Sequence, residues 1–152
     1  MVAPVFQSDR PLVFAHRGGA RLAPENTIAA IDNGMALGCD GFEIDTQLSA
    51  DGIPVVIHDP TLDRTTDRTG AVRNHSATEL AKIDAGFRFE IDGRHPFRGQ
   101  GLAKEVVSAA TAHILEQGRL ALYVHDRTNL ASARVCRSLG YVEYAEEFFS
   151  EY

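Results

Sequence analysis

The chain of 152 residues contains no tryptophan and only two cysteines, and its acidic residues outnumber the basic ones by 21 to 15. A formal net charge of −6 argues against a nucleic-acid-binding or anionic-membrane-binding protein, because both kinds of partner require basic surfaces. No apolar run approaches the roughly 20 residues that cross a bilayer. The first eleven residues lack the basic and apolar segments of a signal peptide, so we expect a soluble cytoplasmic protein without a membrane span.

The two cysteines, Cys39 and Cys136, lie far apart and do not have the spacing of metal ligands. Each stands in an apolar stretch, which favours two buried free thiols in a reducing compartment. A disulfide between them is the alternative.

The densest cluster of reactive residue types lies between Gly41 and Thr66. Residues 42–48 alternate apolar and polar side chains, residues 53–57 are rich in β-branched side chains, and Asp51-Gly52 between them favours a turn. A hairpin about this turn places residues 43 and 45 roughly opposite residues 57–59, and the alternation puts Glu43 and Asp45 on one face. A parallel pairing with a looped crossover is the other possibility.

The rest of the chain alternates strands and helices within a length typical of one domain. A strand is predicted over 12–15, and a helix starts at Asn26 or Thr27 as N-cap and ends before Gly38. A polar loop follows over 59–73, then a short helix over 76–83 with a capping-box pattern, then an irregular stretch over 84–98. Further elements are a helix over 101–117, a strand over 120–124, a helix through 138 capped by Asn129 or Thr128, and a strand or tail over 141–152. The predicted order is β-α-β-β-α-α-β-α-β, an α/β fold.

Several short motifs occur in one order: His16-Arg17-Gly18, Pro24-Glu25-Asn26-Thr27, Glu43-x-Asp45, Asp51-Gly52 and His58-Asp59-x-x-Leu62-x-Arg64-Thr65-Thr66. Taken singly, the motifs have plainer explanations that are favoured over a catalytic one: a surface hydrogen bond for His58-Asp59, a solvated strand face for Glu43 and Asp45, and a surface or loop-bracing role for Arg64. His16-Arg17 before two glycines is equally consistent with a simple turn. As a set, over roughly residues 10–100, they resemble the start of the glycerophosphodiester phosphodiesterase family. The resemblance implies a TIM-barrel phosphodiesterase that uses a divalent cation, calcium or magnesium. It implies Glu43 and Asp45 as metal ligands, His16 and His58 as general acid and base, and Arg17 as a phosphate contact.

The chemistry of phosphodiester hydrolysis calls for the same residue types. Attack on an anionic phosphodiester needs a cation and an arginine to neutralise charge, and carboxylate oxygens suit hard cations. Imidazoles titrate near neutrality and can move protons to the leaving alkoxide and from the nucleophile. The leading hypothesis is therefore metal-dependent hydrolysis of small-molecule glycerophosphodiesters to glycerol 3-phosphate and an alcohol. The further acidic ligand that the family carries on a later strand has no convincing equivalent after Arg98.

The last third of the chain resembles a different family. Residues 98–103, followed by Asn129 and by Leu139-Gly140-Tyr141, are similar to the C-terminal half of a GNAT-type N-acetyltransferase, although Cys136 stands where that family often has a tyrosine. The resemblance implies that a glycine-rich loop at a helix N-terminus holds the pyrophosphate of acetyl-CoA. The cofactor-binding residues would be Arg98, Gly99, Gly101, Ala103 and Asn129.

Together the two resemblances predict a chimera of two truncated domains, 1–97 and 98–152. The first would supply the first three strands of a TIM-barrel-like phosphodiesterase, and the second a GNAT-like α/β half, closed as one small α/β sandwich. A complete TIM barrel needs about 250 residues. Open sheet edges would allow a homodimer. The alternatives to hydrolysis are an acetyl-CoA-binding acetyltransferase remnant and a catalytically inactive recombined chain.

Overall fold

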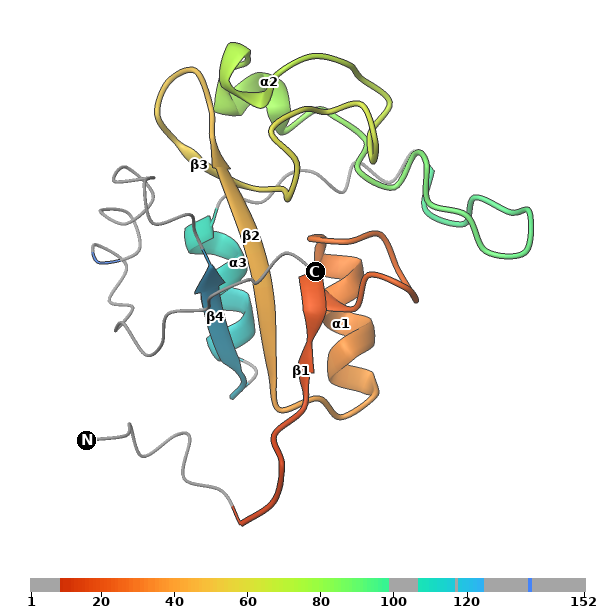
Figure 1. Ribbon diagram of the computed structural model, residues 1–152, viewed down its shortest axis with the longest axis vertical. Helices are drawn as coiled ribbons and strands as arrows, with labels where there is room; N and C mark the ends of the chain where they lie inside the picture. Colours follow the sequence, from red (N-terminus) through yellow and green to blue (C-terminus); the bar gives the residue numbers. More distant parts are fainter. Residues whose placement is uncertain (1–8, 99–106, 117, 125–136, 138–152) are drawn as a thin grey trace, which may run out of the picture.

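The computed structural model describes residues 9–98, 107–116, 118–124 and 137 (Figure 1). The strands are β1 (Phe14–Ala15), β2 (Gly41–Leu48), β3 (Pro54–Val56) and β4 (Leu120–Val124); the α-helices are α1 (Ile28–Ala36), α2 (Ala77–Leu80) and α3 (Val107–Glu116); two 3-10 turns are η2 (His16–Gly18) and η3 (Val72–Asn74). This order confirms the predicted one as far as β4. The predicted helix over 129–138 and the start of the one over 101–117 lie outside the described residues.

Strand β2 is the centre of the sheet, with β1 along one edge and β4 along the other (Figure 1). Both neighbours run parallel to it, and the register with β4 places Leu122 beside Glu43. Strand β3 pairs antiparallel with the end of β2, from Thr46 opposite Val56 to Leu48 opposite Pro54. The hairpin about Asp51-Gly52 is thus confirmed, and the alternative parallel pairing is wrong.

The prediction that residues 1–97 supply three barrel strands is corrected by this topology. TIM-barrel strands are all parallel, whereas β3 is antiparallel to β2 and pairs only with the end of that strand. The third parallel strand in the described part of the chain is β4, which the sequence had assigned to the other half. The sheet therefore continues across the boundary predicted between residues 97 and 98, and that boundary stays a prediction. Residue periodicity and turn chemistry predicted the strands and the β2–β3 hairpin, but not the pairing of β4 with β2, which depends on contacts far apart in sequence.

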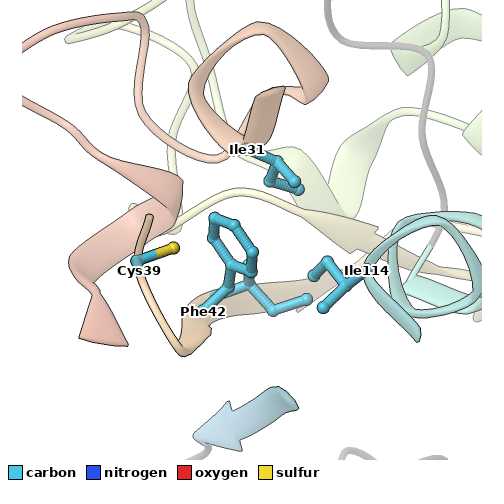
Figure 2. Packing of buried hydrophobic residues seen from close by; sticks show 5 residues of the cluster. Ile31, Cys39, Phe42 and Ile114 are labelled. Atoms are coloured by element: carbon cyan, nitrogen blue, oxygen red, sulfur yellow. The ribbon is translucent and has the colours of Figure 1, made fainter. Parts of the chain in front are cut away.

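Helices α1 and α3 pack against the same face of the sheet. The core there is formed by buried side chains from both helices, from β2 and from the connection between α1 and β2: Ile31, Cys39, Phe42, Ile44 and Ile114. Figure 2 shows Phe42 in the middle of this cluster, with Ile31 from α1 and Ile114 from α3 near it. Side chains alternate along a strand, so Glu43 and Asp45, which alternate with Phe42 and Ile44 along β2, lie on the opposite face.

Helix α1 begins at a confirmed cap. The hydroxyl oxygen of Thr27 accepts a hydrogen bond from the Ala30 amide, so of the two predicted N-caps Thr27 is the one used. Within the helix, Gly34 allows a close approach: a Cβ added there would lie 2.8 Å from Cε1 of Phe42 and 3.0 Å from the Gly18 carbonyl oxygen. This approach brings η2, which carries His16 and Arg17, against α1.

The polar segment after β3 forms a second, smaller cluster under the hairpin. Its buried members are Leu62, Val72, Leu80 and Ile83. The predicted capping box is present at α2, where the Ser76 hydroxyl and the Glu79 carboxylate bond reciprocally to each other's backbone amides. The loop that carries Arg64 therefore packs on this second hydrophobic cluster, separate from the core beneath β2.

Of the two cysteines, Cys39 is a buried free thiol, as predicted, and burial raises its pKa. Cys136 lies outside the described residues. No helix within the described ranges is both long and apolar enough to cross a membrane.

Candidate active site

The site begins at η2, where the chain leaves β1. Arg17 adopts the left-handed conformation, with φ 51° and ψ 37°. That conformation costs about 1–2 kcal/mol for a residue with a Cβ. It lets the Arg17 amide donate a 3.0 Å hydrogen bond to Oε2 of Glu43, while the Arg17 carbonyl accepts a 2.8 Å bond from the Asn26 amide. The strained turn thus connects β1, the start of α1 and the polar face of β2.

Asn26 fixes the second carboxylate. Its side-chain amide donates to Oδ2 of Asp45 at 3.0 Å, and its side-chain oxygen accepts from the Asp45 amide at 3.1 Å. Asn26 is buried and also has a positive φ, 59°, which asparagine tolerates better than most residues. The sequence predicted it only as a possible helix cap.

The four residues predicted from the first motifs are in contact with one another. His16 Nε2 lies 3.8 Å from Oε2 of Glu43, and Arg17 Nε lies 3.5 Å from Oδ2 of Asp45. Arg17 also donates from Nη1 to Glu25 at 3.1 Å. Its Nε is fully buried and makes no hydrogen bond within the described part of the chain. Burial, with a contribution from the nearby Asp45 charge, raises the pKa of Glu43.

His58 lies just beyond β3 and is joined to Asp59. Its Nδ1 is 2.6 Å from Oδ1 of Asp59, and its carbonyl accepts a 2.8 Å bond from the Gln47 side chain. The hydrogen bonds from Arg64 hold the pKa of Asp59 at about 2. An ionised carboxylate only accepts hydrogen bonds, so the proton of a neutral His58 must be on Nδ1. Nε2 is then left as a proton acceptor.

Arg64 is a residue whose role the sequence left open between a surface arginine and a loop brace. It makes forked contacts with two carboxylates, those of Asp59 and Glu25. Glu25 is largely buried, and burial alone would raise its pKa. The hydrogen bonds and charges of Arg64 and Arg17 outweigh this effect and lower the pKa.

The donor set on the polar face of β2 suits a hard cation. In the described part of the chain, the contacts to Glu43 and Asp45 engage Oε2 and Oδ2, which leaves Oε1 and Oδ1 for a metal ion. No group of three His, Cys, Asp or Glu side chains is placed to hold a metal there. The neighbouring positions on β4 are Leu122 and Val124, so β4 adds no carboxylate at them. Two carboxylates completed by water and substrate phosphate are typical of magnesium sites.

Two hollows flank the site, and both are lined in part by Glu25. One extends from His58 over the second cluster and is mainly apolar: Asn26, Val55, Val56, Ile57, Leu62, Thr65, Thr66, Leu80, Ile83 and Ala85 complete its lining. The other is more polar and is lined by Ala20, Pro24, Arg64, Thr65, Ala85, Arg88 and Phe89. Both hollows therefore lie next to Glu25, which also contacts Arg17 and Arg64.

Of the residues predicted to bind acetyl-CoA, Arg98 is the one that lies within the described part of the chain. Arg98 stacks its guanidinium over the ring of Phe87, 4.3 Å from the ring centre, and donates to the Phe87 carbonyl. Gly99, Gly101, Ala103 and Asn129 lie outside the described residues.

The Arg64 contacts predict a loss of stability in acid. The pKa of Asp59, about 2, is below the value of about 3.9 for an unfolded chain, so the stabilisation is complete above pH ~5 and is lost as pH falls toward 2. We expect Asp59→Asn to lower the free energy of unfolding by about 1 kcal/mol at pH 7, a modest value because Arg64 is half exposed and screened. Urea unfolding of the wild type and of Asp59→Asn should show that the difference between their free energies of unfolding shrinks as the pH falls toward 2. A difference that stays constant with pH would contradict the prediction.

The site thus brings two carboxylates suited to a cation into contact with His16 and Arg17. His58 is linked to them indirectly, through Asp59, Arg64 and Glu25. Carboxylates, imidazoles and an arginine are the residue types that metal-assisted phosphoester hydrolysis uses. The glycerophosphoryl diester phosphodiesterase family matches residues 16–141, and the chain belongs to this family. Members of this family generally use divalent cations. The match extends across residues 98–141, so the predicted acetyltransferase half and the chimera find no support.

Individual relatives agree with this assignment. The chain is 52% identical over 80 residues to a glycerophosphodiester phosphodiesterase of Caldanaerobacter subterraneus subsp. tengcongensis, a match that covers 53% of this chain and 33% of the relative. The glycerophosphoryl diester phosphodiesterase domain of a Mycobacterium tuberculosis protein has a similar structure (TM-score 0.76, 31% identity, 87% of this chain and 50% of the other).

A further similar structure is an Oleispira antarctica phosphodiesterase in complex with the product sn-glycerol-3-phosphate (TM-score 0.65, 32% identity, 84% of this chain and 52% of the other). The chain spans about a third of the length of the curated relatives and about half of the solved ones. Its fold is therefore an α/β fold resembling the TIM-barrel structures of this family.

Proposed function

We propose that the chain carries the metal-binding and proton-transfer residues of a hydrolase that converts glycerophosphodiesters to glycerol 3-phosphate and an alcohol. The observation that supports this most is the contact of His16 and Arg17, just beyond β1, with Glu43 and Asp45 of β2. The product named for the Oleispira antarctica structure agrees with this substrate class.

In the proposed site, Glu43 and Asp45 hold a calcium or magnesium ion. When bound, the ion neutralises phosphate charge and lowers the barrier to attack. The Arg17 guanidinium, already shared with Glu25 and Asp45, adds positive charge on the same side and contacts the phosphate.

His16 and His58 share the acid and base roles. A water oxygen forms a bond to phosphorus, and one imidazole takes its proton. The bond from phosphorus to the alcohol oxygen breaks, and the other imidazole protonates the leaving oxygen. His58, with its proton on Nδ1, offers Nε2 for one of these transfers. The more exposed His16, next to Glu43, is placed for the other.

The test is release of glycerol 3-phosphate from a glycerophosphodiester with calcium, with magnesium or with EDTA. We expect release that depends on metal and falls by about 10²–10⁴-fold in His16→Ala, because one proton transfer is then lost. His75→Ala, at a histidine remote from the proposed chemistry, is the matched control and should keep the activity. Release that survives both EDTA and His16→Ala would overturn the proposal.

Dimerisation through sheet edges stays a prediction. In the described part of the chain, β1 and β4 form the two edges of the parallel sheet, and each pairs there with β2 alone.

A further inference from the structure

Arg64 makes four side-chain hydrogen bonds beside the proposed site. Its Nε donates to Oδ2 of Asp59 at 2.6 Å and its Nη2 to Oδ1 at 3.0 Å. Its Nη1 donates to Oε2 of Glu25 at 2.9 Å, and Nη2 also donates to Oε1 of Glu25 at 2.6 Å. Four of the five guanidinium N–H donors are thus used by two carboxylates from segments 34 residues apart.

Each carboxylate also contacts a residue of the proposed site. Oδ1 of Asp59 accepts from Nδ1 of His58, and Oε1 of Glu25 accepts from Nη1 of Arg17. A carboxylate whose two oxygens both accept hydrogen bonds from one planar guanidinium cannot rotate freely. The direction of the His58 ring and the position of Arg17 therefore both depend on the same guanidinium.

We propose that Arg64 is a positioning residue, which holds Asp59 so that His58 keeps its proton on Nδ1 and presents Nε2 to the substrate. The role in catalysis rests on the proposed function, but the effect on the His58 ring does not. Arg64 itself contacts neither a proposed metal ligand nor a proton-transfer residue, so it acts through the two carboxylates.

Both carboxylates require an arginine at this position. A lysine ammonium has the charge but lacks the planar fork, so it cannot grip both oxygens of Asp59 and both oxygens of Glu25 together. Asp59 and Arg64 are five residues apart on one loop, whereas Glu25 precedes α1. Arg64 consequently also fastens the loop that carries His58 to the segment before α1, which carries Glu25 and Asn26.

The test reads the His58 ring directly, with ¹⁵N-labelled histidine and NMR spectra of the metal-free protein at pH 8, where a free imidazole is neutral. In the wild type we expect a protonated Nδ1 and an unprotonated Nε2. In Arg64→Met the two nitrogens should shift toward the average of a tautomer mixture, as they should in Asp59→Asn. Arg73→Met, at an exposed arginine in the same segment, should leave the spectrum unchanged.

An unchanged His58 spectrum in Arg64→Met would overturn the proposal. If Arg64→Met does not fold, Arg64→Lys decides, since it keeps the charge and should still shift the His58 nitrogens; wild-type His58 signals in that variant would equally overturn it. In the hydrolysis assay we expect both variants to lose about 10–100-fold in kcat with less change in KM. If the wild type has no hydrolase activity, the proposed function fails. The NMR experiment still tests whether Arg64 sets the tautomer of the His58 ring.

Discussion

Replacing Glu43 with glutamine should reduce metal-dependent hydrolysis by about 10³-fold, equivalent to roughly 4 kcal/mol of transition-state stabilisation. Glutamine has nearly the same shape and can still accept the hydrogen bond from the Arg17 amide, so the turn at η2 should stay in place. What is lost is one of two negative charges on a face of β2 to which β4 adds no carboxylate beside Glu43 and Asp45. The assay is release of glycerol 3-phosphate over a titration of magnesium and of calcium.

The matched control is Glu116→Gln, which removes the same charge from the exposed end of α3. It should leave activity and metal dependence unchanged. We expect Glu43→Gln to be as stable as the wild type or slightly more stable, because burial disfavours the charged form of this carboxyl group and raises its pKa. Full activity in Glu43→Gln at low magnesium would rule out Glu43 as a metal ligand.

Truncating Phe42 to alanine should have the largest effect on folding. The ring is completely buried between α1 and α3, in the middle of the core cluster (Figure 2). Phenylalanine-to-alanine changes in cores cost about 3–5 kcal/mol, because contacts are lost and a cavity remains. That is a large part of the roughly 5–15 kcal/mol that stabilises an ordinary domain. Urea unfolding followed by circular dichroism gives the difference.

Leu115→Ala, at a side chain on α3 that is 56% exposed, is the control and should change the free energy of unfolding by less than about 0.5 kcal/mol. A loss of under 1 kcal/mol for Phe42→Ala would mean that the two helices do not share the core described for them. Because the Phe42 ring also lies against Gly34, relaxation of the helix toward the sheet could recover part of the loss.

The sequence by itself determined the local elements and the residue types of the site. The threonine cap of α1, the capping box of α2 and the hairpin about Asp51-Gly52 depend on neighbours a few residues away. The capping box was predicted outright, and the cap and the hairpin were each one of two predicted alternatives. Alternation along residues 42–48 placed Glu43 and Asp45 on one face for the same reason, since side chains of a strand alternate whatever its partner.

Only the tertiary structure decided what these elements contact. The parallel pairing of β4 with β2, the use of Asn26 to hold Asp45, and the double fork of Arg64 all join segments between 5 and about 80 residues apart. Such contacts arise when the chain buries its apolar faces, and no local propensity encodes them. The motifs therefore indicated the chemistry, whereas the packing of α1, β2 and the hairpin decided which side chains hold one another in place.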